Sequence, residues 1–164
     1  PFSLLGSYSG ASGMPQFMPG SIRKYAVDFD GDGQIDLRNS PIDAIGSIAN
    51  FLVQHGWRRG EPVVFPVSVP SSQGADAGWQ KLLGKSLSAE FTLDEIRSGG
   101  VTPVIEPPPG SLFTLVDLQN GFEPTEYWIG APNFFAIAQY NRSYFYAMSV
   151  LELGRSVKAV RDIR

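Results

Sequence analysis

The chain has 164 residues, 43% of them hydrophobic, which suffices for roughly one domain, or one and a half small ones, around an ordinary globular core. Its net charge of −3 gives no support for broad binding to nucleic acid or to an anionic membrane. The absence of cysteine excludes disulfides, thiolate catalysis and zinc fingers, and the single histidine, His55, leaves little for a histidine-based triad. No apolar run approaches the ~20 residues of a membrane span. Because Pro1 is not a natural translation start, we expect a trimmed or processed piece of a longer protein.

The first part of the chain predicts loops followed by one clear helix. Residues 1–21 are rich in glycine and serine, which predicts loop with short helical turns, and residues 28–39 predict an acidic loop. A helix then begins at Pro41, with Ser40 as its N-cap, and ends at Gly56. Its expected apolar face consists of Ile45, Ile48, Ala49 and Leu52.

The middle of the chain predicts strands and short helices. Residues 61–70 predict an extended strand, which we place at a sheet edge because prolines interrupt it. A short helix around Trp79 follows, and Thr92 and Glu95 form a capping box for another short helix.

The last part of the chain predicts a strand pair and then helix. Residues 112–118 and 126–129 are the expected strands, and Asn120-Gly121 is the turn signal between them. From Asn133 the pattern is helical. Apolar residues at three- and four-residue steps predict one buried stripe of Tyr146, Val150, Leu153, Val157 and Val160.

Aspartates at alternate positions in the segment DFDGDGQID form the strongest chemical motif in the chain. Carboxylates this close together repel one another unless a cation neutralises them, and Ca2+ takes oxygen ligands at this spacing. Read as an EF-hand-type loop, the segment predicts a structural calcium site. Its candidate ligands are Asp28, Asp30, Asp32, the backbone carbonyl of Gln34, Asp36 and Asp43.

The ligand set of this loop stays open at its last position. Position 12 of an EF-hand loop is a bidentate glutamate, and here it is Asn39. Asp43, in the first turn of the following helix, could reach back instead. The alternative is an Asp/Gly turn without a metal, in which Asp43 only caps a helix.

Aromatic and amide side chains suggest a polysaccharide site, because aromatic faces stack on sugar rings and amides bond hydroxyl and N-acetyl groups. The candidate contact residues are Gln16, Tyr8, Phe17, Tyr140, Asn141 and Tyr146. The alternative is that Phe17 and Tyr146 are core residues, the commoner fate of aromatic side chains at helical spacing.

Two regions of the chain resemble a known family. The segment GSYSGASGMPQFMPGSIRKYAVDFDGDGQIDL, followed by PIDAIGSIANFLVQHGW, and the later segment APNFFAIAQYNRSYFYAMSVLELG closely resemble the B-type membrane-bound lytic transglycosylases of bacterial peptidoglycan. These motifs are long and specific, and they cover residues 1–57 and about the last 34 residues. Residues 60–125 resemble the family only loosely.

The resemblance implies an α+β fold: a mainly helical lysozyme-like core, of which this is the C-terminal part, with a small antiparallel β insert. Residues 1–60 would form a core segment with the EF-hand-like calcium loop, residues 61–130 a small β-rich domain, and residues 131–164 the C-terminal helices that complete the core. The family cleaves the β-1,4 bond between N-acetylmuramic acid and N-acetylglucosamine without water and leaves a 1,6-anhydro end. One glutamate acts first as acid and then as base, so a second carboxylate is not required.

The resemblance also implies roles for individual residues. The catalytic glutamate is expected a few residues upstream of Pro1, outside this chain, and Ser7 resembles the serine that orients it. Gln16 resembles the glutamine that contacts the sugar N-acetyl group. The polar-aromatic wall of the cleft is matched by Tyr140, Asn141 and Tyr146, and the family's calcium site by Asp28, Asp30, Asp32 and Asp43.

No sequence feature indicates that another carboxylate of the chain replaces the absent glutamate as general acid. A general acid needs a raised pKa, usually through burial beside apolar groups. Glu95 is explained as a capping residue, and Glu152 lies on the last helix. The remaining candidates, in the expected β insert, are Glu106, Glu123 and Glu126.

Three functions stay open at this point: a lytic transglycosylase fragment, a non-catalytic peptidoglycan-binding or scaffold module, and a generic calcium-binding domain. The residues before Pro1 would distinguish the first two, and titration with glycan fragments the third. For the enzyme, the resemblance implies peptidoglycan strands and the upstream segment of the same protein as partners, and no nucleic acid. It also implies the periplasm or cell envelope of a Gram-negative bacterium, with or without a lipid anchor on the N-terminus.

Overall fold

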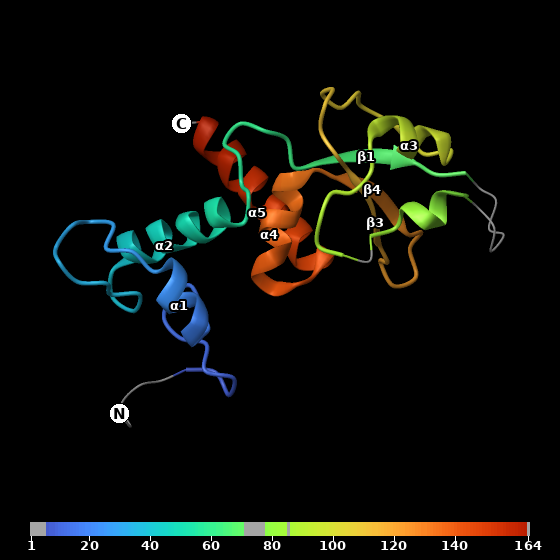
Figure 1. The fold of residues 1–164 in the computed structure, drawn as a ribbon. Coiled ribbons are helices and arrows are strands. Elements are labelled where there is room, and N and C mark those ends of the chain that lie inside the picture. Colours follow the sequence, from blue (N-terminus) through green and yellow to red (C-terminus); the bar gives the residue numbers. More distant parts are fainter. Residues whose placement is uncertain (1–5, 71–77, 85, 164) are drawn as a thin grey trace. The chain divides into compact units, whose positions relative to one another are not determined.

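The computed structural model describes residues 6–70, 78–84 and 86–163 and divides into two compact units, Pro1–Trp57 and Arg58–Arg164. We call them the N-terminal unit and the C-terminal unit. Figure 1 shows the elements in chain order, with two helices in the first unit, then strands and short helices, and two helices at the end. Helix and strand are therefore mixed, as expected for an α+β chain.

The N-terminal unit is built on α1 (Pro19–Tyr25) and α2 (Pro41–Gln54), which the acidic loop connects. The predicted start of α2 is confirmed, because the Ser40 hydroxyl accepts a hydrogen bond from the Asp43 N–H at 3.2 Å. Gly56 follows the helix at φ +90°, a conformation that favours a residue without a Cβ and ends the helix.

An aromatic cluster joins α1 to α2. The Tyr25 ring packs edge-on against Phe51, with ring centroids 4.9 Å apart, and Phe17 packs on Phe51 at 5.9 Å. His55 stacks on Phe51 at 4.0 Å. The Asn50 amide donates a hydrogen bond to the Tyr25 carbonyl at 2.9 Å, which fixes the end of α1 against α2.

The buried face of α2 differs from the predicted one. Ile45 is 66% exposed and Ala49 is also exposed, so this part of the prediction is wrong. The acidic loop packs on the opposite side, where a Cβ added to Gly46 would collide with the Phe29 ring, and small or polar residues are needed there. The residues buried on this side are Asp43, Ala44, Gly46, Ser47 and Phe51.

The C-terminal unit contains a four-stranded antiparallel sheet in the order β2-β1-β4-β3. The predicted strand pair is confirmed, with Val116 of β3 opposite Trp128 of β4. The strand predicted at a sheet edge is β1, which instead lies inside the sheet, between β2 and β4. The two residues of β2 pair with only part of β1, and this incomplete pairing tolerates Pro66. The strands are β1 (Val64–Ser68), β2 (Thr102–Pro103), β3 (Thr114–Leu118) and β4 (Glu126–Gly130).

Two short helices, the 3-10 helix η1 (Gly78–Leu82) and α3 (Leu93–Ser98), contribute to the core of the sheet. The predicted capping box of α3 is confirmed: the Thr92 N–H donates to the Glu95 carboxylate at 2.7 Å, and the Glu95 N–H donates to the Thr92 hydroxyl at 3.3 Å. The buried core consists of Phe65, Trp79, Leu82, Ile96, Val101, Phe113, Leu115, Ile129 and Ala131.

The unit ends with α4 (Pro132–Asn141) and α5 (Tyr144–Asp162). Asn133 is fully buried and ties α4 to the segment that leads into β1. Its Oδ1 accepts from the Arg58 N–H at 2.8 Å, and its Nδ2 donates to the carbonyls of Arg58 and Glu61 at 2.8 and 2.9 Å. Every polar atom of this buried amide is therefore engaged, as a buried polar group requires.

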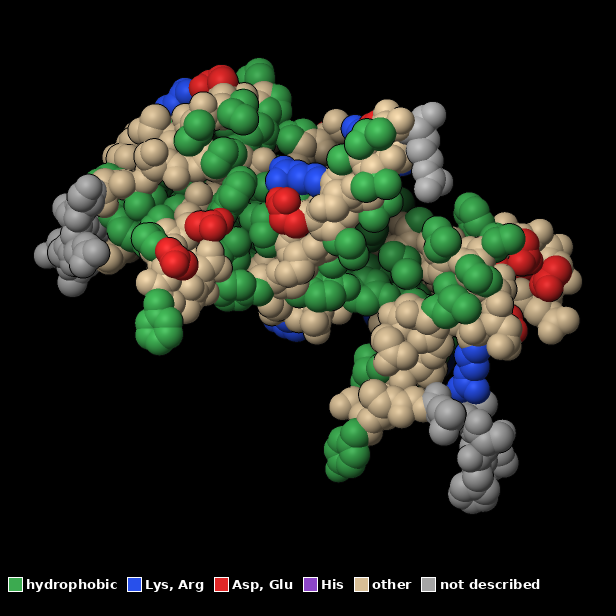
Figure 2. Space-filling model, turned by 180° about the vertical axis from the view of Figure 1, so that it is seen from behind, with side chains coloured by type: hydrophobic (Ala, Val, Ile, Leu, Met, Phe, Trp, Pro, Cys, Tyr) green, Lys and Arg blue, Asp and Glu red, His purple; other side chains and the backbone are tan. Residues whose placement is uncertain are grey.

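Apart from the half-buried Tyr146, the stripe predicted to be buried on α5 is exposed, so that part of the prediction is wrong. Leu153 is 65% exposed and Val157 is 61% exposed, whereas Ala147 in the first turns is fully buried. Figure 2 shows hydrophobic side chains open to solvent along this helix. None of the described helices is both long and apolar enough to cross a membrane.

Candidate functional site

The acidic loop is anchored to α2 by the carboxylate of Asp43, a residue only 1% exposed. Its Oδ1 accepts from the Phe29 N–H at 2.8 Å and its Oδ2 from the Asp36 N–H at 2.8 Å, so one side chain joins both limbs of the loop. The hydrogen bond from Asp36, followed by that from Phe29, lowers the pKa of Asp43. The Val27 N–H donates to the Ser47 hydroxyl of the same helix at 3.0 Å.

Asp28 and Asp30 bring their carboxylates to Asp43. One oxygen from each of these three side chains lies within 4.8 Å of the other two. Asp28 is held in place because its carboxylate accepts from the N–H groups of Gly31 and Gly33 at 2.7 and 2.8 Å. Figure 2 shows acidic side chains gathered at this end of the N-terminal unit. Three anionic oxygen donors at this spacing repel one another and fit a hard divalent cation such as Ca2+.

Other predicted ligands have local partners instead. The Asp32 carboxylate accepts from the Gln34 N–H at 2.8 Å, which forms an Asx-type turn. The Asp36 carboxylate accepts from the Asn39 side-chain amide at 2.9 Å, and this hydrogen bond is the first cause that lowers the pKa of Asp36. Asp43, not Asp36, is therefore the residue that meets the first two aspartates of the loop.

The glycine-rich loop places Ser7 in a tight turn. The Ser7 N–H donates to the Ala11 carbonyl at 2.9 Å, and the Ser7 hydroxyl oxygen accepts from the Ala11 N–H at 3.0 Å. Tyr8 beside it is fully exposed. Phe17 is only 2% exposed and packs on Phe51, so the structure places its ring in the core rather than on a surface that could stack on a sugar.

Gln16 occupies a strained turn that is clamped to the acidic loop. Its φ of +50° lies in the left-handed region, which is uncommon for a residue other than glycine, and its side-chain amide donates to the Gly13 carbonyl at 2.8 Å. The Met14 N–H donates to the Leu37 carbonyl at 2.8 Å, and a Cβ on Gly13 would lie 2.6 Å from that same oxygen. The turn that presents Gln16 therefore rests on the end of the acidic loop.

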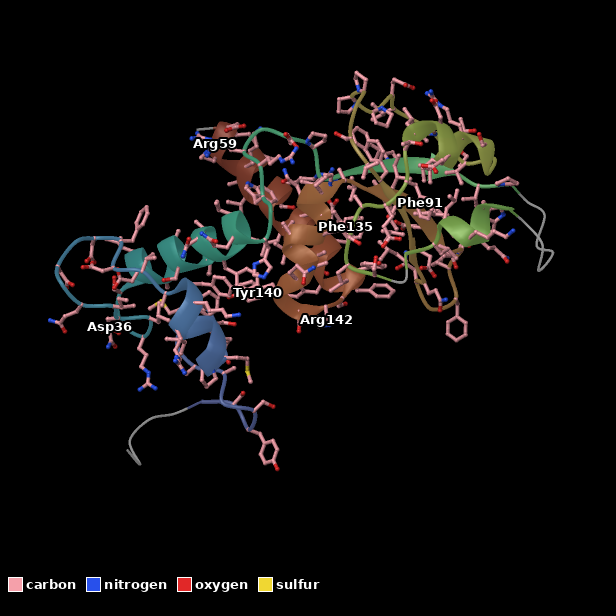
Figure 3. The ribbon with its side chains drawn as sticks, viewed as in Figure 1. Asp36, Arg59, Phe91, Phe135, Tyr140 and Arg142 are labelled. Carbon is pink, nitrogen blue, oxygen red and sulfur yellow. The ribbon has the colours of Figure 1, made fainter. Side chains whose placement is uncertain are left out.

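Tyr140, Asn141 and Tyr146 lie together where α4 meets α5, as Figure 3 shows for Tyr140 at the end of α4. The two tyrosine rings are stacked, with centroids 6.1 Å apart and an interplanar angle of 17°. Burial raises the pKa of both phenols, and the neighbouring Tyr146 raises that of Tyr140 further. Both therefore stay protonated near neutral pH. A neutral aromatic pair beside the exposed Asn141 amide has the chemistry that a sugar ring needs.

A second set of contacts at this corner was missed by the sequence analysis. The Tyr144 hydroxyl donates to the Ser86 carbonyl at 2.7 Å, and the Gln139 amide donates to the Leu87 carbonyl at 3.1 Å. These bonds join positions more than fifty residues apart, which no local motif predicts. The only available signal was Ser143, whose hydroxyl caps α5 by accepting from the Tyr146 N–H.

Comparison with known proteins gives a match along nearly the whole chain. Residues 1–155 match the family described as Transglycosylase SLT domain. Over 166 aligned residues the chain is 40% identical to the membrane-bound lytic murein transglycosylase B of Escherichia coli (strain K12), and the match covers 98% of this chain and 42% of that protein.

Solved structures agree with this match. The catenated lytic transglycosylase SltB1 from Pseudomonas aeruginosa is 41% identical, with a TM-score of 0.84 over 97% of this chain and 50% of that one. The Escherichia coli lytic transglycosylase Slt35 in complex with calcium is 38% identical, with a TM-score of 0.79 over 97% of this chain and 47% of that one. SltB3 from Pseudomonas aeruginosa in complex with NAG-anhNAM-pentapeptide is 36% identical, with a TM-score of 0.72 over 92% and 39%.

This chain thus spans about half, or somewhat less, of the length of the relatives that it matches. The matched residues include the acidic loop, the glycine-rich loop and the segment where α4 meets α5. The chain belongs to the Transglycosylase SLT domain family.

Proposed function

We propose that this chain is the C-terminal part of a lytic transglycosylase that cleaves bacterial peptidoglycan. The proposed reaction breaks the β-1,4 bond between N-acetylmuramic acid and N-acetylglucosamine and closes a 1,6-anhydro ring on the muramic acid. The observation that carries the proposal is the stacked pair of Tyr140 and Tyr146 beside the exposed amide of Asn141, in a chain of this family.

We assign the acid to a glutamate upstream of Pro1, because five of the seven described glutamates have a lowered pKa or an ion-pair partner. A general acid needs a raised pKa. The Ser86 hydroxyl instead lowers the pKa of Glu90, and the Thr92 N–H lowers that of Glu95. Further glutamates form exposed ion pairs, namely Arg58–Glu61, Arg97–Glu106 and Arg155–Glu152.

In this proposal the loop residues orient the acid and bind the sugar. The Ser7 hydroxyl oxygen accepts the Ala11 N–H, so its hydrogen can donate to the upstream carboxylate. Gln16 presents an exposed amide on a strained turn and bonds the N-acetyl group. The exposed ring of Tyr8 stays in the proposed contact set, whereas the buried Phe17 leaves it.

A Ca2+ ion held by Asp28, Asp30 and Asp43 has a structural role in this proposal. When bound, it supplies the positive charge that the three carboxylates lack. The donor set supports this assignment, and a relative solved in complex with calcium agrees with it. Because Met14 bonds the Leu37 carbonyl, an ordered acidic loop also supports the turn of Gln16.

The proposed organisation is a lysozyme-like core formed by residues 1–60 and 131–164, with residues 61–130 as a small β-rich domain. The antiparallel sheet within residues 64–130 supports the β-rich part. The proposed location is the periplasm or cell envelope, which the name of the membrane-bound relative supports.

Digestion of purified peptidoglycan by the full-length protein, followed by mass spectrometry of the products, tests this proposal. The expected products carry 1,6-anhydro ends and are lighter by one water than hydrolysis products. The 164-residue chain alone should release none, since general acid–base catalysis contributes roughly 10^2- to 10^4-fold. Products with reducing ends would show a hydrolase instead. Binding without cleavage by the full-length protein would show a binding module.

A further inference from the structure

A pocket of about 270 Å³ opens at the corner between α4 and α5. It is lined by Gly84, Ser86, Leu87, Arg142 and Tyr144. Its volume lies just below that of whole drug-sized ligands, so it suits a single polar group and its immediate surroundings rather than a disaccharide.

The wall of this pocket is rigidly held. The Tyr144 hydroxyl donates to the Ser86 carbonyl at 2.7 Å, and Gln139 fixes the neighbouring Leu87 carbonyl. A Cβ on Gly84 would collide with the Tyr144 hydroxyl, so the glycine allows the close approach of these two segments. The pocket is thus formed before any ligand arrives.

Arg142 provides the pocket with a positive charge at a strained position. As the C-cap of α4 it adopts φ +47° and ψ +39°, a left-handed backbone conformation that glycine adopts without steric strain. Such strain in a residue other than glycine motivates a functional reading. Within residues 6–70, 78–84 and 86–163, no carboxylate forms an ion pair with Arg142.

Charges of both signs act near the pocket, because Glu90 and Asp117 raise the pKa of the lining Tyr144 further after burial has raised it. The 19-residue helix α5 begins at Tyr144, two positions after Arg142, so the positive end of its dipole adds to the positive charge of this segment. The Glu90 carboxylate already accepts hydrogen bonds from the hydroxyls of Ser86 and Ser88.

Arg142 directly follows the residues proposed to bind the glycan. It lies two positions after Tyr140, which limits their Cα atoms to about 7 Å apart. Figure 3 shows both residues at the same end of α4. A relative has been solved with a glycan that carries a pentapeptide. We propose that this pocket binds a carboxylate of the peptide stem of peptidoglycan through Arg142, an inference that rests on the proposed function.

Calorimetric titration of the full-length protein with defined fragments tests this inference. The ligands are an anhydro-disaccharide with its pentapeptide, the same compound with amidated stem carboxylates, and the disaccharide without peptide. Arg142→Gly removes the guanidinium and keeps the left-handed corner without strain, and Arg142→Asn is a second variant that tolerates this conformation. Arg59→Ala is the matched control, because it removes one positive charge at an exposed position of the same unit, labelled apart from Arg142 in Figure 3.

Both Arg142 variants should bind the pentapeptide ligand about tenfold more weakly, the low end for a hydrogen bond to a charged group. Their affinity for the amidated and the peptide-free ligands should equal that of the wild type and of Arg59→Ala. Equal weakening for all ligands would overturn the inference and assign Arg142 to the glycan site. Unchanged affinity for the pentapeptide ligand would overturn it as well. Failure of the wild type to bind any of the three would instead overturn the proposed function.

Discussion

The N-terminal and C-terminal units are stabilised by different interactions. In the C-terminal unit the side chains of Phe113, Leu115 and Ile129 have no exposed surface and form one continuous apolar core. In the N-terminal unit the inward side of α2 is largely polar or small, and Asp43 at its centre holds the acidic loop by hydrogen bonds. Among residues 6–57, its buried apolar side chains include Phe17, Leu37, Ala44 and Phe51.

This difference has a consequence for the candidate glycan contacts. Tyr140 lies on the largely buried helix α4 and stacks on Tyr146 of α5, so the geometry of the pair should depend little on solution conditions. Gln16 rests on a loop clamped to Leu37, and that loop depends on how the aspartate charges are neutralised. We therefore expect ions to act on the Gln16 turn and packing mutations to act on the tyrosine pair.

The largest expected effect is in the apolar core. Phe113→Ala should lower the free energy of unfolding of the C-terminal unit by about 3–5 kcal/mol, because it leaves a cavity among fully buried neighbours. Denaturant titration gives the value, and hydrogen exchange shows which unit is affected. Phe122→Ala, at a fully exposed turn position, is the control and should change stability by less than about 0.5 kcal/mol. A comparable loss in both variants would contradict the role of the core.

Calcium should act on the other unit. At a hundredfold excess over Kd, a ligand that binds only the folded state stabilises it by about 2.7 kcal/mol. Since the loop lacks the position-12 glutamate, we expect modest affinity, with Kd on the order of 10^-4 M. Thermal melts with calcium and with a chelator measure the shift, and hydrogen exchange should confine it to residues 27–43. Asp30→Asn should reduce it and Asp94→Asn, on α3, should not; identical midpoints would make the acidic loop a metal-free turn.

Gln16→Ala should weaken binding of a muropeptide by about 1–3 kcal/mol, through lost hydrogen bonds to the N-acetyl group. Chelation of calcium should also weaken binding of the muropeptide, because the Gln16 turn is hydrogen-bonded to the Leu37 carbonyl of the acidic loop. Calorimetric titration of the full-length protein measures both. Gln54→Ala, at an exposed position at the end of α2, is the control and should bind normally. If Gln16→Ala also bound normally, the glutamine would be only a turn residue.

The smallest expected effect concerns the capping box of α3. The Thr92 N–H lowers the pKa of Glu95 below 4.5, so the carboxylate contributes stability above that pH and loses it as the pH falls through the folded-state pKa. Glu95→Gln should therefore lower the melting midpoint at pH 7, and the difference should vanish in acid, where the Glu95 carboxyl is protonated in both the folded and the unfolded state. Thr92→Val should remove the same pH dependence. A midpoint difference that persists in acid would contradict this account.

Elements with local signals were predicted correctly. The N-cap of α2, the capping box of α3 and the β3–β4 pair each follow from residues within about ten positions of one another. The buried sides of α2 and α5 were not predicted correctly. Periodicity shows that a helix has an apolar side, but it does not show which element packs there. On α2 the acidic loop packs on the small, polar side, while Ile45 stays exposed.

The sequence by itself determined the acidic loop, since the Asp28 carboxylate is held by N–H groups three to five residues further along the chain. Only the tertiary structure decided that Asp43, rather than Asp36, meets Asp28 and Asp30. Tertiary structure also decided the hydrogen bond from the Tyr144 hydroxyl to the Ser86 carbonyl, because the two residues are 58 positions apart. Short-range hydrogen bonds follow from local backbone geometry, whereas long-range ones exist only after the fold has closed the loop between their partners.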